Sequence, residues 1–344
     1  MKGTFNNERG FGVEIEFARP RNISKQDIVT AINIYANSSA TSSPVHCEVE
    51  GYNHITRPHW KLTSDGSVDG HRGYIGSNEL VSPILYGQDG KEQLRVVLQV
   101  LNDLECEVNV SCGVHTHHDV TGVMIQEEEV AAKFLNNLIK FVAKFEHFIY
   151  RLVSASRLRR SWCLPVRRIF ANMHRVEFAS VQQTRNDATL KAIAKRVFKN
   201  VKDGVKYKYS QVGSGTGSSY APNFQPTRYC GLNLRNIWTR GSVEFRYMQG
   251  SLNFDKIWSW IVFTQAIINV VESANSVSFK NVPTTQAGFF YFRKALGFIG
   301  SKDRDEDVKF ANKEIQKRFK AMTTTEQESR RLTAQDYNLT RAGI

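Results

Sequence analysis

The chain has 344 residues, of which 41% are hydrophobic and 23% are charged, a composition that excludes disordered and collagen-like proteins. No apolar run is long enough to cross a bilayer, and residues 1–10 lack the apolar core of a signal peptide, so we expect a cytoplasmic protein without a membrane partner. The five cysteines contain no C-x-x-C pair and predict reduced thiols, while the formal net charge of +13 favours anionic partners.

The first predicted element is a strand at residues 10–17, GFGVEIEF. Because side chains alternate along a strand, Glu14 and Glu16 share one face and the apolar residues between them share the other. Ser24 then has the character of a helix N-cap, and Asp27 is its capping-box partner. The helix that follows should end before the Ser-rich loop at 37–44.

A short strand is expected next at residues 60–62, followed by an Asp-Gly turn at 63–68 and a second short strand at 78–85. A glycine-containing turn at 87–90 then leads to a helix at 92–104. Asp65 lies in the Asp-Gly turn. Glu79 falls on the strand face opposite Leu80. This part of the chain therefore adds two further carboxylates in short, well-bounded elements.

A histidine-bearing strand is predicted at residues 113–120, after a shorter one at 108–110. Alternation places His115, His117 and Asp119 on the same face. The next element is a long helix at 126–152, whose apolar stripe is typical of a helix that faces a core.

Basic residues are concentrated after this helix. Residues 151–210 contain 15 Lys/Arg and 3 Asp/Glu, and 187–200 predicts a basic helix. Such a block favours nucleotide phosphates, nucleic acid or an acidic polymer as a partner, and the alternative is a solvated face that keeps the protein soluble. The Gly/Ser stretch at 213–219 predicts a flexible loop or lid rather than a phosphate-binding loop.

A strand is predicted at residues 240–250, RGSVEFRYMQG, after another strand at 223–234. It carries an acidic and a basic residue on the same face. Alternation places Glu244 and Arg246 together on it. Helices are expected at 255–271, 285–296 and 305–322, followed by a mobile polar tail. We expect one main domain at 1–300, with the basic, mainly helical insert at about 151–220, and a charged helix and tail at 301–344.

Three separated strands thus carry ligand-type side chains on one face. If the strands belong to one sheet, these side chains converge on one concave surface, where a divalent cation would balance their charge: Glu14, Glu16, His115, His117, Glu244 and Arg246. The alternative for any single strand is a half-exposed antiparallel strand with a solvated face.

The motifs GFGVEIEF, WKLTSDGSV, ELVSPIL, VSCGVHTHHDV, SRLRRSWCLP, RYCGLNL and GSVEFRYMQGSLN occur in this order. Over about residues 11–260 the chain resembles the amidoligase family of bacteria and their phages, in the carboxylate-amine ligase superfamily with glutamine synthetase and glutamate-cysteine ligase. The resemblance implies an α+β, glutamine-synthetase-like fold: a curved, mostly antiparallel sheet with helices on its outer side. It also implies that ATP and two or three Mg²⁺ ions, with Mn²⁺ as an alternative, bind in the concavity.

The resemblance implies roles for individual residues at matching positions. The implied metal ligands are Glu14, Glu16, Glu79, His115 and Glu244. His117 would lie near the phosphates or the carboxylate substrate, and Arg246 would contact the transferring phosphate. Arg157 and Arg160 would contact phosphate or substrate. Asp65 and Asn233 would lie near the site. The chain departs from the family pattern at Ser242, where threonine is common, and at His118, an added imidazole.

The predicted function is an ATP- and Mg²⁺-dependent ligase that joins a carboxylate and an amine, as an amide or isopeptide bond, through an acyl phosphate. The incoming ammonium must lose a proton, and Asp65 or Asp119 could accept it. The expected partners are a carboxylate substrate and an amine donor, either a small molecule, a peptide or an anionic polymer, and an accessory enzyme such as an amidotransferase. We expect the protein to act in the cytoplasm of a bacterial cell or of a phage-infected host.

Two other functions fit parts of the sequence. The first is a metal-dependent hydrolase that uses the same Glu/His cluster with zinc or manganese to activate water. The second is a nucleic-acid-binding protein that uses the basic segment. The Glu-x-Arg strand favours phosphate chemistry over plain hydrolysis.

Overall fold

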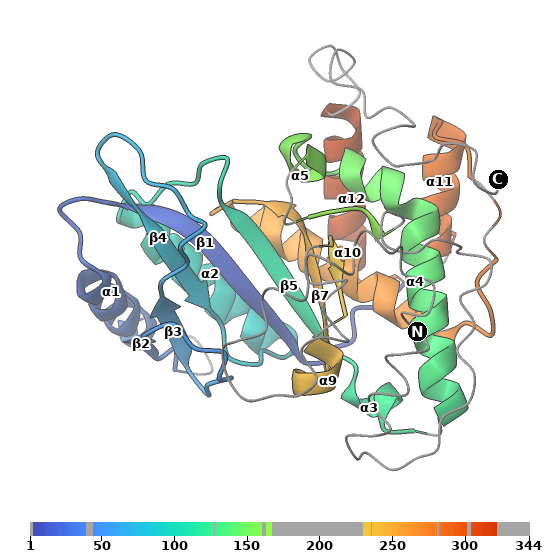
Figure 1. Ribbon diagram of the computed structural model, residues 1–344, viewed down its shortest axis with the longest axis horizontal. Helices are drawn as coiled ribbons and strands as arrows, with labels where there is room; N and C mark the ends of the chain where they lie inside the picture. The colour runs from blue at the N-terminus through green and yellow to red at the C-terminus, as the bar shows by residue number, and fades with distance from the viewer. Residues whose placement is uncertain are drawn as a thin grey trace, which may run out of the picture. The chain divides into compact units, whose positions relative to one another are not determined.

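The computed structural model describes residues 3–38, 44–126, 128–159, 163–166, 230–234, 236–278, 280, 282–300 and 304–321. The chain forms two compact units (Figure 1). The sheet unit comprises Phe5–His118 and Met248–Val262, and the helical unit comprises Met1–Thr4, Asp119–Tyr247 and Phe263–Ile344.

Five strands of the sheet unit are ordered β2-β3-β4-β1-β5. Strand β1 pairs antiparallel with β4 and β5, β4 pairs antiparallel with β3, and only the edge strand β2 runs parallel to its neighbour. The strands are β1 (Phe11–Pro20), β2 (Cys47–Val49), β3 (Trp60–Thr63), β4 (Tyr74–Val81) and β5 (Gly113–Asp119).

One face of this sheet is apolar and is covered by helices. Val13, Ile15 and Phe17 of the central strand are fully buried on it. Helix α1 (Lys25–Ser38) buries Ile28 and Ile32, and its Asn33 exchanges two hydrogen bonds with the backbone of Cys47 in β2. Helix α2 (Gly87–Asp103) lies behind β4 and β1 in Figure 1. The opposite face, which carries the polar residues of β1, is left for a site.

The capping box predicted for α1 is confirmed. The Ser24 hydroxyl accepts a hydrogen bond from the Asp27 backbone N–H at 3.1 Å, and the Asp27 carboxylate accepts one from the Ser24 N–H at 2.7 Å. Two N–H groups that have no partner within the helix are thereby satisfied.

Helix α2 begins at Gly87, and the prediction that it starts at residue 92 after a glycine turn is wrong. Gly87 has a positive φ of 48° at the first residue of the helix, whereas Gly90 serves close packing. A Cβ at Gly90 would lie 2.7 Å from the Leu85 Cβ and 3.0 Å from the Phe11 ring, so only glycine fits the helix against the strand here.

Two predicted strands also differ from the structure. Strand β4 lies at Tyr74–Val81 rather than 78–85, and it ends before Pro83, which has no N–H to donate to a ladder. Residues 108–110 form no strand, because Asn109 instead closes a turn with the backbone N–H groups of Ser111 and Cys112.

The helical unit contains most of the helices and the two-stranded pair β6–β7, which is antiparallel. The last residues of β7 and the first half of α10 belong to the sheet unit. The elements are α3 (Thr121–Met124), α4 (Glu128–Arg151), α5 (Ser156–Arg159), β6 (Leu232–Asn233), α9 (Asn236–Arg240), β7 (Ser242–Gln249), α10 (Phe254–Ser273), α11 (Gln286–Ala295) and α12 (Glu306–Ala321).

Stacked phenylalanines form the core of the helical unit. Phe145 of α4 stacks on Phe292 of α11 with ring centroids 4.7 Å apart, and Phe289 stacks on Phe319 of α12 at 3.7 Å. The expected core-facing stripe of the long helix is therefore confirmed, since its Phe134, Leu138, Phe141, Phe145 and Phe148 are all buried.

The prediction of an α+β protein with mostly antiparallel strand pairing is confirmed. Among the helices that the structure describes, none is sufficiently long and apolar to pass through a bilayer. The predicted basic helix at 187–200, the Gly/Ser loop at 213–219 and the tail from 322 lie outside the described residues.

Candidate metal centre

The ligand-type side chains of the sheet unit meet on its polar face because of strand register. Glu14 of β1 is directly opposite His115 of β5, and Glu16 is directly opposite Glu79 of β4. Residues directly opposite in an antiparallel pair point to the same face, with Cβ atoms about 5 Å apart. The three strands therefore place two acid-containing pairs side by side.

The imidazole of His115 lies between the two glutamates of β1. Its Nδ1 is 3.0 Å from Glu14 Oε2, and its Nε2 is 3.6 Å from Glu16 Oε1. The second Glu14 oxygen is 3.3 Å from His117 Nε2, and the second Glu16 oxygen accepts a hydrogen bond from the Gly113 N–H at 2.6 Å. Both carboxylates are thus held in fixed orientations.

Two groups of three ligand-type residues result, and Glu79 belongs to both. Glu14, Glu79 and His115 form one group, and Glu16, Asp65 and Glu79 form the other, with the ligand atoms of each group within 4.8 Å of one another. Glu16, Glu79 and His115 are buried. Buried carboxylates at this density repel one another unless a cation compensates them, so these residues fit divalent ions.

Histidines control the charge state of Glu14. Burial alone would raise the pKa of this carboxyl, but His117 and the hydrogen bond from His115 oppose it and hold the pKa well below its usual range. Glu14 is therefore an anion at neutral pH, as a metal ligand must be.

His118 belongs to the other face of the sheet. It pairs with Phe11 across the ladder and is completely buried, and this burial, with the charges of Arg9 and His117, lowers its pKa well below the usual value for histidine. This added imidazole is a neutral core residue and is no part of the metal centre.

The remaining predicted residues belong to the helical unit, and Glu244 accepts hydrogen bonds from several side chains there. It is buried, and one of its oxygens accepts hydrogen bonds from the side-chain amides of Asn233 at 2.6 Å and Asn236 at 2.9 Å. The other oxygen accepts a hydrogen bond from Arg246, two residues along the same strand. Arg157 donates to the backbone carbonyl of Arg246 at 2.8 Å.

Asp119 and Arg160 complete the set of predicted site residues. Asp119 accepts a hydrogen bond from the Thr121 N–H at 2.8 Å and so holds the turn into α3. Arg160 lies outside the described residues.

Sequence reasoning missed two residues that belong with these clusters. Asn236 was not singled out, because its contact with Glu244 depends on the turn into α9. Lys61 was also missed, although alternation in WKLT indicates it: Lys61 pairs with Val81, which pairs with Glu14, so all three lie in one row on the polar face.

Three comparisons with known proteins were made, and the match to a family profile is the informative one. The profile of the family described as "Putative amidoligase enzyme" matches residues 7–268. A search of curated proteins found no match. Among solved structures, the chain is similar to a bifunctional glutathione synthetase from Pasteurella multocida, with 12% identity, a TM-score of 0.39, and coverage of 91% of this chain and 47% of that one. The chain spans about half the length of that enzyme. With most of its length matched by the family profile, the chain belongs to the amidoligase family.

Proposed function

We propose that this protein is an ATP- and Mg²⁺-dependent ligase that forms an amide or isopeptide bond between a carboxylate and an amine. The observation that carries the proposal is the pair of three-ligand groups that share Glu79 on the polar face of the sheet, in a chain of the amidoligase family. In this chemistry ATP supplies the phosphoryl group that turns a carboxylate into an acyl phosphate, and Mg²⁺ neutralises the phosphate oxygens.

The donor set favours magnesium over zinc. Glu14, Glu16, Glu79 and Asp65 are all carboxylates, and His115 is the single imidazole in the two groups. Magnesium prefers oxygen ligands, whereas zinc sites are usually built from imidazole and thiolate. A metal-dependent hydrolase is the second candidate, and it would require tight zinc binding without a nucleotide.

Arg246 is proposed to contact the transferring phosphate and Glu244 to bind metal. The two amides on one Glu244 oxygen fix the carboxylate, while the Arg246 side chain is partly exposed and can exchange Glu244 for a phosphate. A planar guanidinium suits this role, since it can donate two parallel hydrogen bonds to an anion.

A carboxylate must also accept the proton of the incoming ammonium, and Asp65 and Asp119 are the two proposed residues. Asp65 accepts a hydrogen bond from Ser67 and also belongs to the Glu16–Glu79 group, so it is oriented toward cations. Asp119 belongs to no such group among the described residues. A rate that recovers with rising pH in Asp119→Asn but not in Asp65→Asn would assign the base to Asp119.

The test is ADP release from ATP and Mg²⁺ across a panel of carboxylates offered with ammonia and simple amines. We expect release that requires both one carboxylate and one amine in the wild type, and that is lost in Glu16→Gln. Glu92→Gln, a substitution on the exposed face of α2, is the matched control. Steeply salt-dependent nucleic-acid binding without ATP turnover would instead favour the binding protein.

A further inference from the structure

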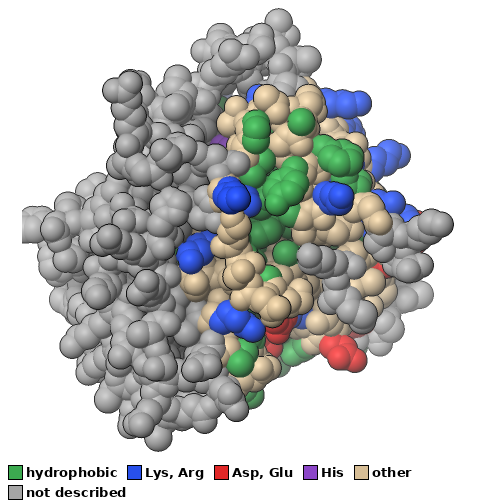
Figure 2. All heavy atoms as spheres, turned by 90° about the vertical axis from the view of Figure 1, so that its right-hand side faces the viewer, with side chains coloured by type: hydrophobic (Ala, Val, Ile, Leu, Met, Phe, Trp, Pro, Cys, Tyr) green, Lys and Arg blue, Asp and Glu red, His purple; other side chains and the backbone are tan. Residues whose placement is uncertain are grey.

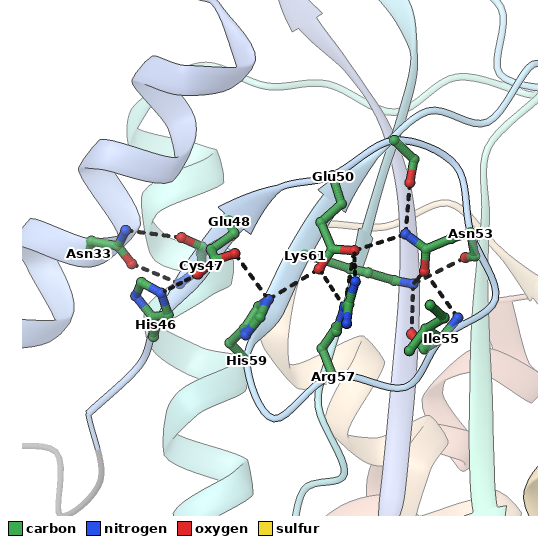
Figure 3. Close-up of polar contacts among 11 residues, drawn as sticks. Asn33, His46, Cys47, Glu48, Glu50, Asn53, Ile55, Arg57, His59 and Lys61 are labelled. Carbon is green, nitrogen blue, oxygen red and sulfur yellow. Dashed lines mark hydrogen bonds and ion pairs between the residues drawn. The ribbon is translucent and has the colours of Figure 1, made fainter.

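A second group of metal-type ligands lies at the edge of the sheet, where β2 and β3 pair in parallel. Residues 50–59 join these two strands without a helix. Parallel strands usually need a connection of about a dozen or more residues, commonly a helix that makes its own backbone hydrogen bonds. This short connection must be held by other groups, and Figure 3 shows that side chains supply them.

Two imidazoles converge on one carboxylate in this connection. His46 Nε2 is 3.0 Å from Glu48 Oε1, and His59 Nε2 is 3.5 Å from Glu48 Oε2. His59 Nε2 is also 3.2 Å from Glu50 Oε1. The two rings stand edge to face with centroids 5.5 Å apart. One nitrogen of His59 therefore faces two carboxylates, although a neutral imidazole N–H can donate to only one of them at a time.

The ligand atoms of Glu48, Glu50 and His59 lie within 4.8 Å of one another, close enough for one ion. His59 and Glu50 are 16% and 11% exposed and are fixed by their surroundings, whereas His46 and Glu48 are 57% and 51% exposed and leave the site open to solvent. Half of the ligands are thus preorganised and half can close on an ion.

Charge in this group also favours a cation. Arg57 forms a fork on Glu50, with its Nε 2.9 Å from Oε1 and its second nitrogen 3.1 Å from Oε2. This contact holds the Glu50 carboxylate in a fixed orientation. Glu48, Glu50 and Arg57 together carry one formal negative charge, which attracts a cation.

We propose that His46, Glu48, Glu50 and His59 form a second cation site, selective for Zn²⁺ and related transition-metal ions. Two imidazoles and two carboxylates suit Zn²⁺, whereas Mg²⁺ favours a set of oxygen ligands alone. The ion would hold the short connection closed at the edge of the sheet, independently of the ligase reaction.

This edge site is separate from the metal centre on the same face. Glu48, Lys61, Val81 and Glu14 form one row across β2, β3, β4 and β1, so Glu48 is three strand spacings, about 14 Å, from Glu14. Lys61 lies between them, and its ammonium donates to the Asn53 and Ile55 carbonyls of the connection at 3.1 and 3.0 Å (Figure 3). An ion at the edge site would therefore also position the loop that covers Lys61.

Calorimetric titration with Zn²⁺ tests the proposal. It starts from a protein carrying Glu14→Gln and Glu79→Gln, so that zinc binding at the metal centre is removed. We expect this protein to keep one tight zinc site, and the further His46→Ala and His59→Ala substitutions to weaken it by about 100-fold or more. His54→Ala, in the same connection, is the matched control and should leave zinc affinity unchanged.

A second readout guards against misfolding of the double histidine variant. Co²⁺ bound at a four-coordinate site with nitrogen ligands gives intense visible absorption, and Glu48→Gln, a conservative change of an exposed residue, should weaken or shift it. The proposal is wrong if zinc affinity survives the loss of both histidines, or if the Glu14→Gln and Glu79→Gln protein binds no zinc.

Discussion

Glu79 is the residue on which the two groups of the metal centre depend. It lies opposite Glu16 across the ladder, and its carboxylate belongs to one group with Glu14 and His115 and to another with Glu16 and Asp65. A single carboxylate in this position can bridge two cations, which would place both at a defined separation for one phosphate.

Replacing Glu79 with glutamine should therefore remove more than one contact. We expect Mg²⁺-dependent turnover to fall on the order of 100-fold or more, because a neutral amide cannot stabilise two dications. Steady-state kinetics at several Mg²⁺ concentrations measure this, and Glu92→Gln serves as the control. An unchanged rate at limiting Mg²⁺ would remove Glu79 from the metal centre.

A different buried carboxylate has a structural role. Glu146 of α4 accepts hydrogen bonds from the Tyr247 hydroxyl at 2.7 Å and the Val166 N–H at 2.8 Å, and burial, together with the charge of Glu146, raises the pKa of Tyr247 well above its ordinary value. Tyr247→Phe should lower the free energy of unfolding by about 1–3 kcal/mol, because the buried Glu146 carboxylate loses one of these two donors. Urea denaturation measures this loss, and Tyr291→Phe, on an exposed ring, should have little effect. Equal stability of the two variants would contradict this role.

At the scale of single residues, strand alternation was enough to predict that Glu14 and Glu16 share a face and that His115 and His117 share a face. It could not predict that Glu16 lies opposite Glu79, because register depends on where Pro83 ends β4 and on contacts far apart in the sequence. Asn236 was missed for the same reason, since its contact with Glu244 depends on the turn into α9.

At the scale of elements, the strand β4 and the turn that carries Asp65 are packed against each other through a glycine. A Cβ at Gly76 would overlap the backbone of Val68, Asp69 and Gly70, and Ser77 next to it donates a hydrogen bond to the Val68 carbonyl at 2.9 Å. The position of Asp65 in the metal centre therefore depends on the absence of a side chain at residue 76.

Gly76→Ala should destabilise the protein by about 1–3 kcal/mol and weaken Mg²⁺ binding, because overpacking would displace the Asp65 turn. Gly66→Ala, in that turn but with open space around its Cβ position, is the matched control. Thermal unfolding and Mg²⁺ titration measure the two effects. Equal behaviour of the two variants would show that the turn tolerates the added methyl group.

The predicted long helices agree with the structure because a continuous apolar stripe is a strong local signal, as in α4 and α10. Short elements were predicted less well. The glycines at 87–90 predict a turn, but they lie inside α2, where close packing on Phe11 and Leu85 requires a glycine at residue 90. Such a requirement comes from tertiary contacts and is not visible in a local pattern.

At the scale of the whole molecule, the cysteines are buried packing residues rather than reactive thiols. All five are free and buried, and burial raises the pKa of Cys47 and of Cys106 to about 12. Ellman's reagent should therefore react slowly with the native protein and rapidly with all five thiols once urea unfolds it. Fast labelling of a thiol in the native state would reveal an exposed, reactive cysteine.

The surface charge at this scale suits an anionic ligand. Figure 2 shows Lys and Arg side chains spread among hydrophobic ones on the described part of one face, and most of the formal net charge of +13 comes from the sequence of residues 151–210. A positive protein attracts ATP and acidic substrates over a distance, and added salt weakens that attraction.

The most direct test of the central claim is calorimetric binding of ATP with and without Mg²⁺, in the wild type and in Glu79→Gln. We predict that ATP binds the wild type only when Mg²⁺ or Mn²⁺ is present, and that the substitution weakens this binding by about 10-fold to 100-fold, with Glu92→Gln unchanged. Binding of ATP that ignores both the metal and the substitution, or no binding at all, would contradict the claim that this face of the sheet holds a metal–nucleotide complex.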